Sequence, residues 1–282
     1  MTATPSPVAL VTGTSTGIGR ATALLLAQSG FRIFATVRTA ESEASLLGDA
    51  PGLPLSVLRL DLLDEAAVRH AVRTVLDRAG RIDVLVNNAG YGQLGAIEDL
   101  PRDVLRRQFE VNVFAAMQLC REVLPAMRAQ GSGCIVNVSS IAGRVSVPLI
   151  GAYCASKFAL EALSDALRLE ARPYGVGVVL VEPGPVETKF NDTVRWSRGL
   201  LLPETVYARF YENIISEPGS RYAASPDQVA RVILKAVRSR RPRARYRVRL
   251  AEGFLARAIR VIPTGAMDWS IARWYGLNRR AG

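Results

Sequence analysis

Histidine, lysine and long apolar runs are scarce in this sequence of 282 residues. No uncharged stretch approaches the roughly 18 apolar residues that a membrane-spanning helix needs, and the start, MTATPSPVAL, lacks the basic segment and apolar core of a signal peptide. We therefore expect a cytoplasmic protein. The single histidine, His70, argues against a histidine-based metal site and against a Ser-His-Asp triad, so no metal site is predicted.

Cysteine is scarce as well. The chain has Cys120, Cys134 and Cys154, which form neither a paired framework nor a CxxC metal motif. We expect all three to be buried, reduced thiols.

Arginine and apolar side chains are abundant. Apolar residues make up 49% of the chain, which is enough to bury the core of one large domain. The formal net charge of +11 raises the question of nucleic-acid binding, but the arginines are spread along the chain, so no nucleic-acid partner is predicted. Only Lys157, Lys189 and Lys235 are lysines, which indicates that a retained lysine stands where a compact ammonium is needed.

Apolar runs alternate with amphipathic patterns over most of the chain. The runs are rich in Val, Ile and Leu with little alternation, which is typical of parallel strands covered by helices. We predict strands at residues 8–12, 32–37, 56–60, 82–86, 134–138 and 176–181. This order predicts an α/β fold, a doubly wound parallel sheet of the Rossmann type with helices on both faces. Asp64 is expected to cap a helix, Gly30 and Gly80 to end helices, and Pro125 to kink or end one.

The stretch TGTSTGIG, residues 12–19, leaves the first predicted strand and starts the first helix. Glycines there let the backbone turn sharply and approach a pyrophosphate, which the helix N-terminus favours. A merely tight strand-to-helix turn is the alternative. A second loop, NNAG at residues 87–90, follows the fourth strand, and the first and fourth strands flank the point where such sheets bind dinucleotides.

In YCASK, Tyr153 and Lys157 stand four apart on a predicted helix and therefore on one face. A free tyrosine titrates near ~10, and acid–base work near neutrality needs a shift of about three units. An ammonium about 4 Å away supplies roughly the 4 kcal/mol required. An ordinary exposed pair at this spacing is the alternative.

Five motifs in order, TGTSTGIG, NNAG, NVSS, YCASK and PGPVET, resemble the short-chain dehydrogenase/reductase family over residues 8–190. The run YCASKFALEALSDALRLE is similar to the hydroxysteroid and retinol dehydrogenase branch. The resemblance implies that Tyr153 is the acid in carbonyl reduction and the base in alcohol oxidation. Lys157 would lower the pKa of Tyr153 and hold the nicotinamide ribose.

The resemblance implies two further catalytic residues. Ser140 would polarise the substrate, with Ser139 as its rival. Asn112 would hold a water that links the lysine to solvent, unless it is simply a buried amide satisfied by backbone.

The resemblance also implies cofactor contacts and favours NADP(H) over NAD(H). The acidic residue that ends the family's second strand is replaced here by Val37, and the next residue, Arg38, can clamp a 2′-phosphate. Hydroxyls of the glycine-rich loop would help. Asp61 would meet the adenine unless it caps a helix, and Val186 and Thr188 would lie beside the carboxamide. The full implied set is Gly13, Thr14, Ser15, Thr16, Gly17, Ile18, Gly19, Arg38, Asp61, Leu62, Asn88, Tyr153, Lys157, Val186 and Thr188.

The remaining chain predicts a lid and an extension. Residues 1–250 are expected to form one dinucleotide-binding and catalytic domain, with an aromatic-rich lid at 189–225 over an apolar substrate, or a helix pair packed on the core. In RYRVRL, Tyr246 and Val248 alternate with arginines, which predicts an edge strand with a charged outer face. Residues 251–282 form an amphipathic extension with a first stripe (Phe254, Leu255, Ile259, Ile262) and a second segment (Met267, Trp269, Ile271, Trp274, Tyr275).

The leading hypothesis is an NADP(H)-dependent oxidoreductase acting on a lipophilic ketone or secondary alcohol that is steroid-, retinoid-, polyketide- or quinone-like. The alternatives are a non-catalytic NADP(H)-sensing protein on the same fold and a membrane-surface-associated module. The basic extension could touch an anionic membrane, its own domain or a sister subunit. Relatives usually pair through long helices, so a homodimer or homotetramer is expected.

Overall fold

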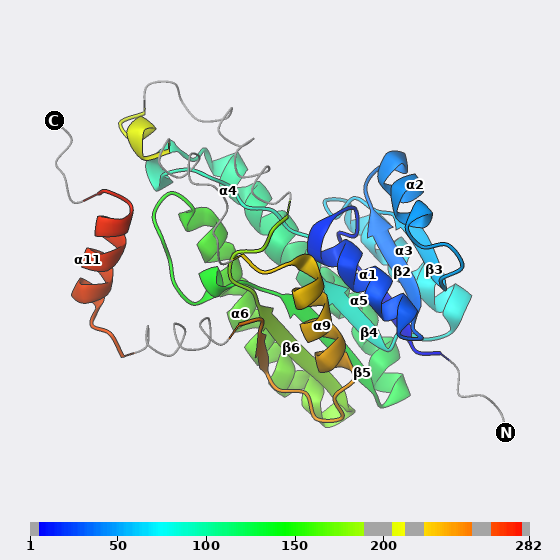
Figure 1. Cartoon of the computed structure of the whole chain (residues 1–282). Coiled ribbons are helices and arrows are strands. Elements are labelled where there is room, and N and C mark those ends of the chain that lie inside the picture. Colours follow the sequence, from blue (N-terminus) through cyan, green and yellow to red (C-terminus); the bar gives the residue numbers. More distant parts are fainter. Residues whose placement is uncertain (1–5, 189–204, 212–222, 250–260, 278–282) are drawn as a thin grey trace.

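The computed structural model describes residues 6–188, 205–211, 223–249 and 261–277. Its centre is a parallel sheet with the strand order β3-β2-β1-β4-β5-β6-β7 (Figure 1). The strands are β1 Val8–Val11, β2 Arg32–Val37, β3 Leu55–Arg59, β4 Val84–Asn87, β5 Gly133–Val138, β6 Val176–Glu182 and β7 Arg245–Arg247. The predicted doubly wound parallel sheet is confirmed.

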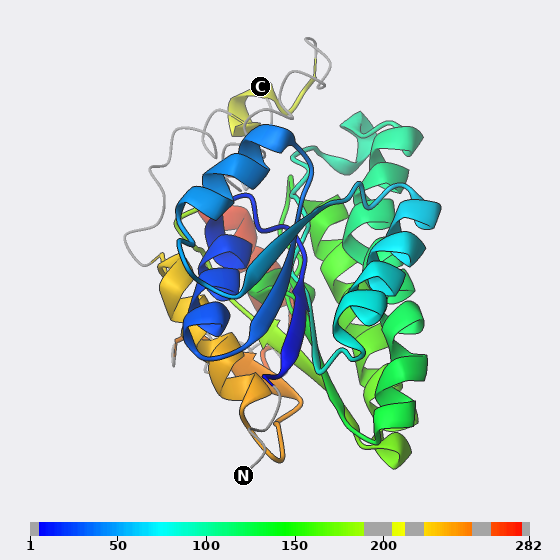
Figure 2. The same cartoon turned by 90° about the vertical axis from the view of Figure 1, so that its right-hand side faces the viewer.

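Helices cover both faces of this sheet (Figure 2). One layer holds α1 Gly17–Gln28, α2 Ala40–Gly48 and α9 Pro226–Val237. The other holds α3 Glu65–Ala79, α5 Ala115–Gln130 and α6 Gly151–Ala171. A buried apolar core lies on each side: Leu26 and Ile233 pack in the first, and Val68 and Leu119 in the second.

The other helical elements lie at the ends of the sheet or beyond it. α4 Arg102–Phe109 runs through the π-helical η2 Glu110–Phe114 directly into α5. Short 3-10 turns are η1 Ile97–Asp99, η3 Ile141–Gly143 and η4 Arg172–Tyr174, and α11 Thr264–Trp274 lies near the C-terminus.

Local sequence signals explain several helix ends. Asp64 caps α3 as predicted, accepting hydrogen bonds from the backbone N–H groups of Ala66 and Ala67 at 2.8 and 3.0 Å. Gly80 ends the same helix in the left-handed conformation, with φ of 71°. Of the two alternatives predicted for Pro125, a kink or an end of its helix, the second is wrong, because α5 continues to Gln130. Burial of Val123 and Met127 in the second core holds the helix together across the one hydrogen bond that proline removes.

The edge strand β7 forms where it was predicted, beside β6, but its arginines do not make a charged outer face. The side chains of Arg245 and Arg247 are only 19% and 23% exposed, and both pair with Glu182, which is fully buried. The correction has a simple cause: buried carboxylates of β6 and α6 need cationic partners, and β7 supplies them.

Parts of the predicted lid and extension lie outside the described residues, among them the lid aromatics Phe190 and Trp196 and the first stripe except Ile262. Leu250, which was expected to alternate with the arginines of the edge strand, lies outside them as well. The described part of the lid packs inward: Phe210 and Tyr211 are buried against Leu94 and Leu149.

α11 lies at the surface of the protein. It buries no residue, and Trp269 and Trp274 are 63% and 77% exposed. Leu277, just beyond α11, packs against the same apolar cluster as Phe210.

The cysteines are free thiols, and Cys134 is only partly buried, contrary to expectation. Within the described ranges, no helix is both long and apolar enough to cross a membrane. The same ranges hold no cluster of three or more His, Cys, Asp or Glu side chains that could bind a metal ion.

Candidate active site

The glycine-rich loop at the carboxyl end of β1 is packed too tightly for side chains at two of its glycines. Gly13 has φ of +70°, and a Cβ there would lie 2.7 Å from the Cα of Ala89. A Cβ on Gly19 would lie 2.2 Å from the carbonyl oxygen of Gly13. This close packing holds the loop and the start of α1 at the switch point between β1 and β4, where doubly wound sheets bind anionic groups of dinucleotides.

A polar clamp fixes the NNAG loop against the glycine-rich loop. The hydroxyl of Thr12 accepts from the backbone N–H groups of Asn88 and Ala89, both at 3.1 Å. The Asn88 side chain donates to the carbonyl oxygens of Thr12 and Gly13 at 3.0 and 3.2 Å. Sequence reasoning missed Thr12, although a lone hydroxyl at the end of the apolar run VALVT was the available signal.

The hydroxyls near the loop are not equivalent. The sequence predicts that a hydroxyl of Thr14, Ser15 or Thr16 helps to bind the phosphate; Thr14 is buried and its hydroxyl donates to the carbonyl oxygen of Thr36 at 2.9 Å, so Ser15 and Thr16 are the candidates for this contact. Thr16 is exposed and makes no cap hydrogen bond to α1, and Ser15 is partly buried. Arg38 is exposed directly after β2, and Ile18 packs against the first core.

Replacing Gly19 with alanine is expected to lower the free energy of unfolding by about 1–3 kcal/mol and to weaken dinucleotide binding, because the new methyl group would press on the Gly13 carbonyl. The matched control is Gly48→Ala in α2, where an added Cβ meets nothing within 4 Å. Alanine favours a helix there, so this variant should be neutral or slightly stabilised. Denaturant unfolding measures both, and equal stability of the two variants would contradict the tight packing at Gly19.

Ser140, Tyr153 and Lys157 come together at the carboxyl end of β5. Ser140 precedes η3 and is hydrogen-bonded to the Tyr153 side chain, while its Oγ also accepts from the Ala142 N–H at 3.1 Å. The Lys157 Nζ lies 5.8 Å from the Tyr153 ring centroid and donates to the carbonyl oxygen of Val138 at 2.9 Å. Ser139, by contrast, is buried, and its Oγ lies beside the Glu161 side chain, since a Cβ on Gly143 would stand 2.9 Å from both.

Burial acts on both titratable groups of this cluster. It raises the pKa of Tyr153 to about 12, with the Ser140 hydrogen bond opposing it. It lowers the pKa of Lys157 to about 8, with the charge of Glu161 opposing it. The expected lowering of the Tyr153 pKa by Lys157 is therefore wrong for the arrangement described, because desolvation of the phenol outweighs the other effects.

Asn112 belongs to the π-helical turn η2, and its side chain lies beside Gly90, as does the ammonium of Lys157. Its side chain exchanges hydrogen bonds with the backbone of Tyr91 at 3.0 and 3.1 Å and donates to the Ser156 hydroxyl at 3.1 Å. Asn112 is thus a buried amide whose hydrogen bonds are made largely with the backbone, which is the alternative that the sequence left open. Asn112 belongs to a π-helical turn, a feature that is frequent at functional sites.

The remaining predicted cofactor residues follow two strands: Val186 and Thr188 come after β6, and Asp61 and Leu62 come after β3. Thr188 lies against Gly17, 3.0 Å from where a Cβ would stand, and Val186 bridges to Ala224. Asp61 is exposed and accepts from the Leu63 N–H at 3.0 Å, while the helix cap is Asp64.

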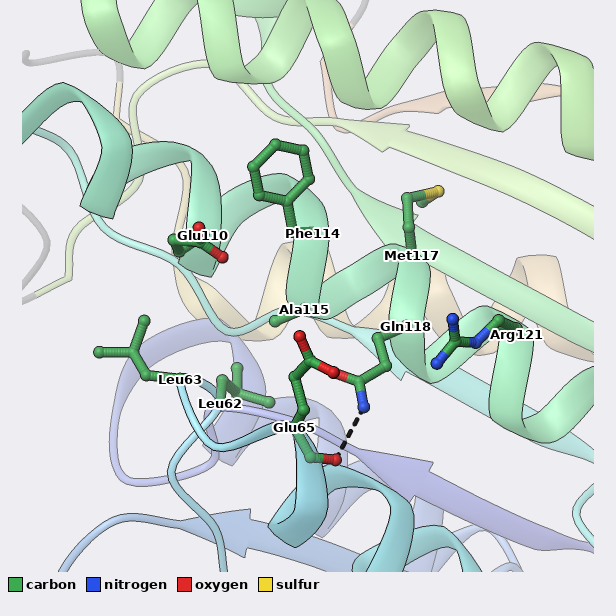
Figure 3. A pocket seen from close by; sticks show the side chains of 9 residues that line it. All are labelled: Leu62, Leu63, Glu65, Glu110, Phe114, Ala115, Met117, Gln118 and Arg121. Carbon is green, nitrogen blue, oxygen red and sulfur yellow. Dashed lines mark hydrogen bonds between the residues drawn. The ribbon is translucent and has the colours of Figure 1, made fainter.

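Leu62 contributes its side chain to a separate pocket of about 310 Å³ between the start of α3 and α5 (Figure 3). The other side chains that line it are Leu63, Glu65, Glu110, Phe114, Ala115, Met117, Gln118 and Arg121. The side chain of Leu62 is thus not among those gathered at the glycine-rich loop.

A sequence model described as short chain dehydrogenase matches residues 7–198. A probable short-chain type dehydrogenase/reductase of Helicobacter pylori is 34% identical over 278 residues, 97% of this chain and 99% of its own. The 3-ketodihydrosphingosine reductase of Bacteroides thetaiotaomicron is 32% identical over 273 residues, with coverage of 96% and 98%. Human 17-beta-hydroxysteroid dehydrogenase type 1 is 38% identical over 252 residues, with coverage of 85% and 76%.

Solved structures agree. A short-chain dehydrogenase from Streptomyces avermitilis superposes with a TM-score of 0.80 at 31% identity, over 100% of both chains. An enzyme from Burkholderia phymatum in complex with NAD gives 0.78 at 26% identity, covering 91% of this chain and 94% of its own. A metagenomic short-chain oxidoreductase in complex with NADP gives 0.69 at 31% identity, covering 86% and 96%. Similar proteins thus bind either nicotinamide dinucleotide.

Proposed function

Because the chain belongs to the short-chain dehydrogenase/reductase family, whose members are oxidoreductases acting on CH–OH and C=O groups, we propose that it transfers a hydride between NADP(H) and a lipophilic ketone or secondary alcohol. The observation that carries this proposal is the cluster of Ser140, Tyr153 and Lys157 at the carboxyl end of β5. The glycine-rich loop, whose closely packed backbone a Cβ would disturb, fits a dinucleotide beside it.

The bound nicotinamide would supply the hydride in reduction and accept it in oxidation. In reduction, the Tyr153 hydroxyl gives its proton to the substrate oxygen as the C=O π bond breaks, and the alcohol forms. Ser140 donates a hydrogen bond to the same oxygen while negative charge develops on it. The ammonium of Lys157 stabilises the phenolate left on Tyr153 until solvent reprotonates it. In alcohol oxidation the same residues act in reverse.

The chain offers partners for each part of the cofactor. Backbone N–H groups at the start of α1, around Gly17, would take the pyrophosphate. Arg38 would bind the 2′-phosphate, with no carboxylate at Val37 to repel it, and this supports NADP(H) over NAD(H). Val186 and Thr188 would hold the carboxamide.

A lipophilic substrate is supported by an apolar cluster that includes the residues just before α6, the helix that carries Tyr153. Leu149 and Ile150, just before Tyr153, pack with Phe210 and Leu277. The names of two relatives, a 3-ketodihydrosphingosine reductase and a 17-beta-hydroxysteroid dehydrogenase, point to substrates of this kind. In the same proposal, residues 1–250 are one domain with a lid at 189–225, and residues 251–282 are an extension that reaches the substrate side through Leu277.

The test of the proposed function is oxidation of NADPH and NADH against a panel of 3-ketosphingoids, steroids, retinoids, quinones and small ketones. Turnover of lipophilic carbonyls with NADPH supports the proposal. Tight NADPH binding with no turnover across the panel would instead favour the cofactor-sensing alternative.

Two association proposals accompany this function. Exposed apolar side chains of η2 and α6, such as Phe114, Phe158 and Leu163, support pairing of two chains through these elements, which light scattering measures. The exposed tryptophans of α11 support peripheral contact with an anionic membrane, which sedimentation with anionic vesicles measures.

The pH profile of carbonyl reduction should fall on its alkaline side near pH 8. Since the pKa of Lys157 is lowered to about 8, its charge is lost as the pH rises through that value, whereas Tyr153, at about 12, stays protonated. Initial rates at saturating cofactor between pH 6 and 10 check this. A rate that stays level to pH 10 would contradict a role for the Lys157 charge.

A further inference from the structure

Behind the catalytic cluster lies a buried group of charged side chains that the proposed reaction does not use. Glu161 and Glu182 are 4% and 0% exposed, and they belong to α6 and to the end of β6. Buried carboxylates without cationic partners are costly, so the surrounding cations decide whether they remain charged.

Arginines from two other segments meet these carboxylates. Arg245 of β7 lies 3.0 Å from Glu161 Oε2 and 3.0 Å from Glu182 Oε1, and Arg247 lies 2.9 Å from Glu182 Oε2. Arg144, just after η3, lies 3.7 and 3.8 Å from the same two carboxylates. The two buried carboxylates are therefore surrounded by three guanidinium groups, which offset their negative charge.

Glu161 is the member of this group that shares a helix with Lys157. It stands four residues after Lys157 on α6, just as Tyr153 stands four residues before it, so the three lie on one face of the helix. A Cβ on Gly143 would lie 2.9 Å from Glu161 Cγ, 2.9 Å from Ser139 Oγ and 3.1 Å from the Lys157 carbonyl oxygen. The turn after Ser140 is thus packed directly onto this part of α6.

We infer that Glu161, held by Arg245 and Arg144, is a positioning residue that keeps the buried Lys157 charged and in place beneath Tyr153. The inference rests on the proposed function for its catalytic meaning, but the charge coupling itself does not. The charge of Glu161 raises the pKa of Lys157 against the lowering by burial, in agreement with this role. The Lys157 ammonium also donates to the neutral carbonyl of Val138 on β5, and a Cβ on Gly90 would lie 3.9 Å from Lys157 Nζ and 3.0 Å from the neutral Asn112 Oδ1 on η2.

The chain allows a direct measurement, because it has only three lysines. In full-length protein labelled with 13C at the lysine ε carbons, the Lys189→Arg and Lys235→Arg variants identify the signal of Lys157. Its titration midpoint is then read by NMR without any substrate. In Glu161→Gln, which keeps the shape but loses the charge, we expect the midpoint to fall by about one pH unit.

The matched control is Asp165→Asn. Asp165 also binds Arg245, at 2.6 Å, but it is one helical turn farther from Lys157 and 39% exposed, so the midpoint should stay where it is. Arg144→Gln tests the opposite sign: with one cation fewer beside Glu161, the midpoint should rise. This variant also keeps the inference testable if Glu161→Gln does not fold.

The alkaline limb of the reduction profile should move with the NMR midpoint in each variant. A midpoint that is unchanged in Glu161→Gln, moves equally in Asp165→Asn, or fails to rise in Arg144→Gln overturns the inference. If the midpoints move as expected but the wild-type protein reduces no carbonyl, the proposed function fails while the coupling stands, so the two failures are distinct.

Discussion

Tyr153→Phe is expected to lower turnover of the best substrate by about 10²–10⁴-fold, since it removes the hydroxyl that we propose exchanges a proton with the substrate oxygen. The change corresponds to about 3–5 kcal/mol in the activation barrier. The dissociation constant for NADPH should change by less than about threefold, because the ring and its packing remain. Steady-state rates and fluorescence titration of NADPH measure the two quantities.

Tyr174→Phe is the matched control for this substitution. Tyr174 lies in η4, beyond the far end of α6, is 53% exposed, and stacks with Arg128 rather than with any residue of the site. Its loss of a hydroxyl should leave turnover unchanged. If Tyr153→Phe retained more than a tenth of wild-type turnover, the proton would have to come from another group, and the assignment of Tyr153 would be wrong.

Arg38→Asp should weaken NADPH binding by about 100-fold while changing NADH binding by less than about threefold. The guanidinium directly after β2 is exposed, and the substitution replaces a charge-assisted bond to the 2′-phosphate with repulsion. Because NADH lacks that phosphate, the ratio of the two dissociation constants isolates the effect. Calorimetric titration of both cofactors checks it.

Arg69→Asp serves as the control for a charge reversal as such. Arg69 lies on α3, is 45% exposed and pairs with Glu65 on its own helix, so both dissociation constants should stay near the wild-type values. Equal weakening of NADPH and NADH by Arg38→Asp would mean that this residue supports the loop rather than the phosphate, and the preference for NADP(H) would lose its basis.

The sheet was accessible from the sequence for a physical reason. Strands buried on both faces consist of uninterrupted apolar runs, and their order leaves few topologies open. The grouping of Ser140 with Tyr153 was implied by the family resemblance, and the fold explains their contact, since β5 and α6 are consecutive and meet at one end of the sheet.

Other features could not be derived because they depend on partners distant in the sequence. Nothing near RYRVRL in the chain indicates that Arg245 meets Glu161 and Glu182, so its alternation suggested a solvated face. The raised pKa of Tyr153 depends on how completely the phenol is desolvated, which local spacing does not encode. The continuation of α5 past Pro125 likewise depends on contacts of Val123 and Met127 with residues of the second core that are distant in the sequence.

The attachment of β7 also bears on the order in which the chain folds. Glu182 ends β6, yet its cationic partners are made only when synthesis reaches Arg245 and Arg247. A nascent chain that stops before them would leave the buried Glu161 and Glu182 carboxylates with Arg144 as the arginine beside them. Stable closure of this half of the sheet is therefore expected to wait until residue 247 has left the ribosome.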